Sequence, residues 1–150
     1  MIFTLENVVE SIAGVLKAGY PDCPVYDSPT QQGTEPPCFF IFFMPSTVEA
    51  QAGGRFMRDL GIDIVFVQQR NIVNGNAGIH RVSEYLDEAL ELIPYSDGSG
   101  QTALIRTYER RWLEEDMELH YQFHIRKRVE LPKDITLMQK LEGDIYVKEK

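Results

Sequence analysis

The stretch that decides the fold reads Leu119-His120-Tyr121-Gln122-Phe123-His124-Ile125-Arg126, with apolar and polar side chains alternating at every position. Successive side chains of a strand point to opposite faces of a sheet, so this pattern puts four apolar residues on one face and four polar residues on the other. It is typical of a half-buried antiparallel strand. We place this strand within residues 117–131, and Pro132 ends it.

Four further stretches are predicted to be extended. Residues 104–113 form a hairpin with this strand around Glu114-Glu115-Asp116, and residues 24–27 are a short extended piece. Residues 38–44 are apolar at every position, which predicts a strand covered on both faces with Phe39, Phe40, Ile41, Phe42 and Phe43 mostly buried. Residues 55–69 are the next strand and pair with it as a hairpin, and the Pro-, Ser-, Ala- and Gly-rich connection 45–54 is expected to protrude with little structure of its own.

Apolar residues recur at three- and four-residue steps in two places, which predicts two helices. The first covers 4–18, with Thr4 as N-cap and with Gly19 and Pro21 ending it. The second covers about 77–92 and is closed by Pro94. Its polar face carries Glu84, Asp87, Glu88 and Glu91, either as a solvated surface or as a patch that binds a partner.

The composition is that of one ordinary domain, with 150 residues, 43% of them apolar and 25% charged. We therefore predict an α+β fold, a two-layer sandwich of an antiparallel four- to five-stranded sheet packed against two helices, over residues 1–132. Residues 133–150 show no clear period and are taken as a C-terminal extension. The net charge of −8 argues against binding to nucleic acid or to an anionic membrane.

The sequence contains no recognisable catalytic, metal-binding or cofactor-binding motif. Cys23 and Cys38 form no C-x-x-C pair, and we expect two reduced, partly buried thiols, with a disulfide between them as the alternative. His120 and His124 share a strand face, but their Cβ atoms would be about 13 Å apart, too far to bind one zinc ion together, and His80 would join them only by chance of folding. The acidic turn 114–116 is half of a Mg²⁺ or Ca²⁺ site or simply a solvated turn.

The sequence also bears on the compartment. The N-terminus lacks the basic region of a signal peptide, and the longest apolar run, 39–44, is far shorter than the ~20 residues of a membrane span. We therefore expect a protein that is made and kept in the cytoplasm.

Six segments, in this order and spacing, resemble a known family. They are Leu5-Glu6-Asn7-Val8-Val9-Glu10-Ser11-Ile12, Tyr20-Pro21 leading into Pro24-Val25-Tyr26, Gln32-Gly33 followed by Pro37-Cys38-Phe39-Phe40-Ile41, Gly54-Arg55, Tyr85-Leu86-Asp87-Glu88-Ala89-Leu90, and Tyr121-Gln122-Phe123-His124-Ile125-Arg126. Over about 130 residues the chain resembles the small phage tail terminator proteins of tailed phages and prophages of Gram-positive bacteria.

The resemblance implies a structural virion protein rather than an enzyme. Family members are similar in fold to other tail terminators, a sheet flanked by helices that assembles as a ring, usually of six copies, at the head-proximal end of the tail tube. The ring stops polymerisation of the tube and faces the head–tail connector, so the implied partners are further copies of the chain, the tube protein and the connector protein. The first alternative is a head–tail joining or completion protein of the virion. The second, which the sequence favours less, is a small ligand-binding domain or enzyme.

The charge distribution and the glycines indicate where copies would meet. Residues 1–125 carry 8 basic and 18 acidic side chains, whereas residues 126–150 carry 7 basic and 5 acidic ones. A ring needs one surface of each copy to meet a different surface of the next, and unlike charges favour such a contact. The alternatives are that the basic end meets a complementary neighbouring protein, or that it is an ordinary tail without a role in assembly. We expect interface residues at the protruding connection and at the basic end: Glu49, Gly53, Gly54, Arg55, Arg126, Lys127 and Arg128.

Overall fold

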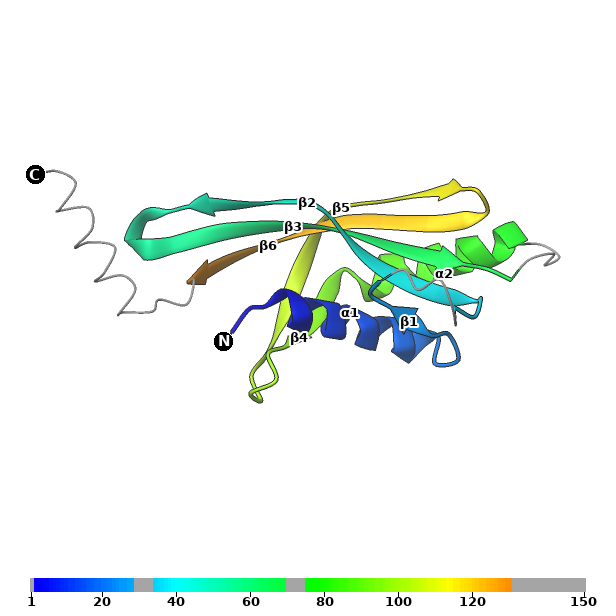
Figure 1. Cartoon of the computed structure of the whole chain (residues 1–150), viewed down its shortest axis with the longest axis horizontal. Helices are drawn as coiled ribbons and strands as arrows, with labels where there is room; N and C mark the ends of the chain where they lie inside the picture. The colour runs from blue at the N-terminus through cyan, green and yellow to red at the C-terminus, as the bar shows by residue number, and fades with distance from the viewer. Residues whose placement is uncertain (1, 29–33, 70–74, 131–150) are drawn as a thin grey trace, which may run out of the picture.

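A computed structural model describes residues 2–28, 34–69 and 75–130 as two helices and six strands (Figure 1). The elements are α1 (Leu5–Gly19), β1 (Val25–Tyr26), β2 (Cys38–Ala50), a 3₁₀ turn (Ala52–Gly54), β3 (Arg55–Val67), α2 (Gly75–Ala89), β4 (Leu92–Ser96), β5 (Thr102–Glu115) and β6 (Glu118–Glu130). The proposed extension 133–150 and the Gln32-Gly33 segment lie outside the described residues.

The strands form one strongly twisted sheet in the order β1-β2-β3-β6-β5-β4 (Figure 1). Every neighbouring pair is antiparallel except β1 and β2, which run parallel. The α+β class is confirmed, but the prediction of a purely antiparallel sheet of four to five strands is wrong, because the described sheet is mixed and has six strands.

The helices cover one face of the sheet and form the core with it. α1 begins at the predicted cap, where the Thr4 hydroxyl accepts the Asn7 N–H at 3.1 Å. The buried apolar side chains of the two helices are Val8, Ile12, Val15 and Leu16 of α1 and Ile79, Val82 and Leu86 of α2. They pack with the inward residues of β6, which are Leu119, Tyr121, Phe123 and Ile125. The apolar side chains of β6 therefore point to the core, as predicted. The opposite face of the sheet carries no helix, and we call it the open face.

Two parts of the chain are strands where the sequence indicated otherwise. The sequence indicates Pro94 only as the residue that closes a helix, whereas in the structure Pro94 lies within β4. Proline is tolerated in a strand at the edge of a sheet, and β4 is such an edge strand. The connection 45–54 is also largely a strand, because β2 continues through a β-bulge between Met44 and Thr47 as far as Ala50. Only residues 51–54 remain as the connection.

The aromatic run in β2 is not covered on both faces, which corrects a second expectation. Phe39 and Ile41 are buried, whereas Phe40 and Phe42 are half-buried and stack on the open face with ring centroids 5.7 Å apart. Phe43 points to the core side but is 40% exposed, since β1 pairs with β2 only at Phe39 and Phe40 and leaves the rest of β2 near the edge of the sheet.

Both cysteines are free and buried, as expected. Burial raises the pKa of the Cys23 and Cys38 thiols above their ordinary value, so both stay protonated at neutral pH.

Candidate assembly interface

Three strands extend beyond the helices at one end of the molecule and form what we call the arm, residues 45–50 of β2, 55–59 of β3 and 126–129 of β6 (Figure 1). The strands are in register across its full width. Val48, Arg58 and Lys127 form one row, and Glu49, Met57 and Arg128 form the next. The arm is therefore a three-stranded extension of the sheet rather than a loose loop.

The tip of the arm is a tight turn that depends on two glycines. The N–H of Gln51 donates to the carbonyl of Arg55 at 2.8 Å and closes the turn. Gly53 and Gly54 have φ of 80° and 73°, in the left-handed region that favours glycine. The Arg128 guanidinium donates from Nε to Gln51 Oε1 at 3.0 Å, which ties β6 to this tip.

The seven residues predicted as an interface lie together on the arm. Glu49, Gly53, Gly54 and Arg55 lie on the β2–β3 hairpin and its tip, and Arg126, Lys127 and Arg128 lie on the adjacent end of β6. The sequence indicated two separate candidates, and the pairing of β3 with β6 makes them one surface. The arm carries five cations (Arg55, Arg58, Arg126, Lys127 and Arg128) against two carboxylates, Glu49 and Asp59. Their role at an interface remains a prediction.

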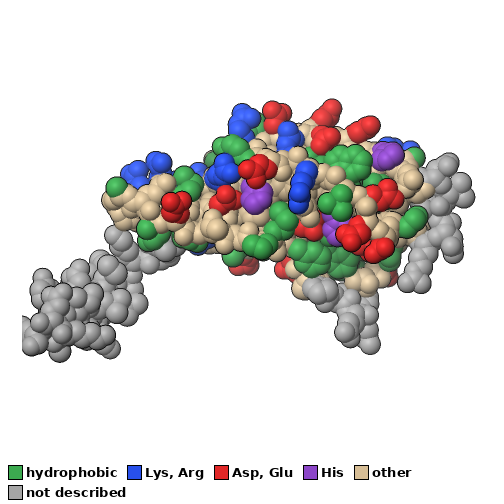
Figure 2. Space-filling view, turned by 90° about the horizontal axis from the view of Figure 1, so that it is seen from above, with side chains coloured by type: hydrophobic (Ala, Val, Ile, Leu, Met, Phe, Trp, Pro, Cys, Tyr) green, Lys and Arg blue, Asp and Glu red, His purple; other side chains and the backbone are tan. Residues whose placement is uncertain are grey.

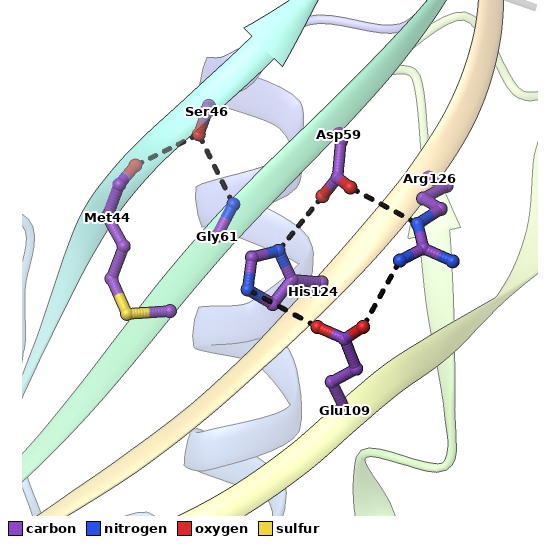
Figure 3. Close-up of polar contacts among 7 residues, drawn as sticks. All are labelled: Met44, Ser46, Asp59, Gly61, Glu109, His124 and Arg126. Atoms are coloured by element: carbon purple, nitrogen blue, oxygen red, sulfur yellow. Dashed lines mark hydrogen bonds and ion pairs between the residues drawn. The ribbon is translucent and has the colours of Figure 1, made fainter.

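A polar cluster at the root of the arm joins β3, β5 and β6 on the open face (Figure 3). Asp59 accepts from His124 Nδ1 at 2.9 Å through Oδ1 and from Arg126 Nε at 3.1 Å through Oδ2. Glu109 closes the cluster, with carboxylate oxygens 3.3 Å from Arg126 Nη2 and 3.9 Å from His124 Nε2. Arg126 also lies over the Tyr108 ring, 5.1 Å from its centroid.

The cluster shifts the ionisation of its charged members. Burial by itself would raise the pKa of Asp59, but the hydrogen bonds from His124 and Arg126 outweigh it and hold the pKa of that carboxyl below its usual value. The same hydrogen bond to Asp59 raises the pKa of Arg126. Because Asp59 is ionised, its oxygens only accept, so His124 Nδ1 carries a proton.

Hydrogen bonds and close packing also join β2, β3 and β6 at the root of the arm. The Ser46 hydroxyl donates to the Met44 carbonyl at 3.0 Å and accepts the Gly61 N–H at 3.2 Å, which closes the β-bulge in β2 (Figure 3). Gly61 is tightly enclosed, because a Cβ there would lie 3.0 Å from Met44 Cβ and 3.3 Å from His124 Cε1. Glu109 reaches the cluster from a second bulge, in β5, where its φ is 56°.

Sequence reasoning missed Asp59, Glu109 and Gly61 as structural partners of His124. A signal for the carboxylate was present, since Asp59 and Asp63 are four residues apart in one strand and His124 and His120 are four apart in its partner. The second pair also forms, with His120 Nδ1 3.1 Å from Asp63 Oδ2. Figure 2 shows this open face, where acidic, basic and histidine side chains interrupt the apolar surface. Within residues 2–28, 34–69 and 75–130, no three His, Cys, Asp or Glu side chains are grouped to hold a metal ion.

Carboxylates gather at the other end of the molecule, away from the arm. The β5–β6 turn carries Glu114, Glu115 and Asp116, all exposed, and α2 presents Glu84, Asp87 and Glu88 to solvent. One of these carboxylates also stabilises the fold, since Asp87 accepts a hydrogen bond of 2.6 Å from the Tyr121 hydroxyl. The described surface is thus basic at the arm and acidic over α2 and the β5–β6 turn.

The fold and this surface define a small α+β protein with an extended arm of strands. A family model described as "Phage tail terminator protein" matches residues 7–136, so the chain belongs to this phage tail terminator family and is a structural component of a phage tail. The resemblance seen in the sequence is confirmed. No curated protein matches the chain. Neither described helix is long and apolar enough to cross a membrane.

Proposed function

We propose that this protein is the tail terminator of its phage or prophage. It assembles in the host cytoplasm as a ring on the head-proximal end of the tail tube, stops tube polymerisation and joins the tail to the head–tail connector. Membership of the phage tail terminator family supports this role, and the arm is the structural observation that carries it.

The shape and charge of the arm favour contact between unlike surfaces of neighbouring copies. A ring of identical subunits is built from heterologous contacts, in which a surface of one copy meets a different surface of the next. The arm is basic, and the exposed surface of α2 is acidic. Like surfaces would repel each other, whereas the arm of one copy attracts the body of another.

The experiment mixes purified protein with its own tail tube protein and scores capped tubes of defined length by electron microscopy. A shortened-arm variant replaces residues 48–58 with Asn-Gly, which joins the paired residues Thr47 and Asp59 by a two-residue hairpin turn. We expect the shortened variant to melt as the wild type does, by circular dichroism, and to lose capping. Wild-type protein that leaves tubes uncapped contradicts the proposed function, and capping by the shortened variant contradicts the role of the arm.

A further inference from the structure

A groove of about 650 Å³ lies between α1, the end of α2 and β4, on the helical side of the molecule. Its apolar walls come from Val15 and Ala18 of α1, Tyr85 and Ala89 of α2, and Leu92 and Pro94 of β4. The groove is open at Gly14 of α1, which has no side chain to fill it, and a Cβ there would meet nothing within 4 Å. Leu104, at its border, is 66% exposed, more than any other large apolar side chain in the described ranges.

One carboxylate lines this apolar groove, and two more are next in sequence to residues that line it. Glu10 lines it, and the exposed residues Glu88 and Glu91 directly adjoin the lining residues Ala89 and Leu92. Glu91 is paired only loosely, 3.9 Å from Arg106. Neither Glu10 nor Glu88 forms an ion pair with another described residue. The groove therefore offers apolar walls with free negative charge at the border.

One face of the arm has the complementary character. The face continuous with the core side carries Val48, which is 53% exposed, and the half-buried Phe56. On the same face Arg58 lies opposite Val48 and two residues from Phe56 along β3, and Lys127 lies opposite Arg58 on β6. Neither cation forms an ion pair with a described residue. The arm thus presents apolar side chains flanked by free cations.

We propose that this groove receives the arm of a neighbouring copy, with Val48 and Phe56 on the apolar walls and with Arg58 and Lys127 facing Glu10 and Glu88. The inference rests on the proposed ring. The arm extends away from the helices of its own chain (Figure 1), so the arm that fills a groove belongs to another copy. Apolar burial supplies attraction, and the opposite charges fix the register of the contact.

The test reverses the charges on each side. An R58E/K127E variant has an acidic arm, and an E10K/E88K variant has a basic groove border. Each alone places like charges across the contact, and we expect capped tubes to fall at least about tenfold. Combining all four substitutions in one chain places an acidic arm against a basic groove, and we expect capping to return. E114K/E115K, with the same charge change at the β5–β6 turn, is the matched control and should retain the contact.

A cross-link identifies the occupant of the groove directly. Val48→Cys and Ala18→Cys are placed in separate chains, which are mixed on tubes and oxidised; both positions are exposed, whereas the native Cys23 and Cys38 are buried. We expect a disulfide-linked dimer from the mixture and not from either variant alone. A mixture without the dimer, reversed variants that still cap, or failure of the combined variant to recover overturns the groove contact while leaving the ring intact. Failure of wild-type protein to cap tubes rejects the proposed function instead.

Discussion

The ring of Tyr85 lies against the backbone of Gly19 so closely that a Cβ on Gly19 would be 2.3 Å from Tyr85 Cζ. The Tyr85 hydroxyl then donates to the Val15 carbonyl at 2.7 Å, and its ring packs edge-on against Tyr20 with centroids 5.5 Å apart. These contacts join α2 to the end of α1. They set the separation of the two helices that form the proposed groove.

Gly19→Ala is therefore expected to destabilise the fold by about 1–3 kcal/mol, because the aromatic ring must move out of its packed position. Gly14→Ala is the matched control within the same helix. Position 14 has open space around it and lies inside α1, where alanine is favoured over glycine by about 0.5–1 kcal/mol. Urea unfolding of both variants measures the difference, and equal effects would contradict the packing at Gly19.

Asp59→Asn is expected to loosen the root of the arm. The substitution removes the charged acceptor shared by His124 and Arg126, while the core on the other face of the sheet is untouched. We expect faster amide hydrogen exchange in 47–59 and 126–129 and little change in α1. Asp63→Asn, which removes the equivalent carboxylate beside His120, is the control and should leave exchange in the arm unchanged. Unaltered exchange in the arm of Asp59→Asn would show that the cluster does not fix it.

Asp97 should make the fold sensitive to acid. Its carboxylate accepts from the Ser99 hydroxyl at 2.6 Å, the Ser99 N–H at 2.9 Å and the Ile2 N–H at 3.1 Å, and these hydrogen bonds lower its pKa to about 2. The ordinary value of about 3.9 applies to the unfolded chain, which therefore binds the proton first as pH falls. The stabilisation is full above about pH 4 and is lost as pH falls to about 2.

The measurement compares urea midpoints at about pH 5 and about pH 2.5 for wild-type protein and Asp97→Asn. Other carboxylates also titrate in this range, so the difference between the two proteins carries the information. We expect the wild type to lose more stability than the variant, and parallel losses would contradict the role of Asp97.

Alanine substitutions in β2 should cost more unfolding free energy at the buried Phe39 than at the partly exposed Phe43. Phe39 is completely buried, and Phe39→Ala should cost about 3–5 kcal/mol of unfolding free energy. Phe43 is 40% exposed, and Phe43→Ala should cost much less, about 1 kcal/mol. Chemical denaturation measures both, and similar costs would mean that Phe43 is covered in the isolated chain.

A chelator should leave the melting temperature unchanged. The Nδ1 atoms of His120 and His124 contact two different aspartates, Asp63 and Asp59. Thermal unfolding with and without EDTA tests this expectation. A drop of several degrees would reveal a bound metal that stabilises the fold.

The sequence by itself determined the features that depend on local periodicity. The alternation from Leu119 to Arg126 fixed which face of β6 is buried, because side chains of a strand alternate with a period of two. The cap at Thr4 and the apolar steps after it fixed α1, since both act within a few residues along the chain. The order and spacing of such segments also identified the family, which the match over residues 7–136 confirms.

Only the tertiary structure decided the features that depend on neighbours distant in the chain. Pro94 lies in a strand because β4 is at the edge of the sheet, and residues 45–50 are a strand because β3 pairs with them across a bulge that Ser46 closes. The 49–55 hairpin and the cations at 126–128 became one arm through the register of β3 with β6, and the same register placed Asp59 beside His124 and Arg126. Pairing of this kind joins residues about 70 positions apart, and no local pattern records it, because the free energy that selects the register comes from packing the whole sheet on its helices.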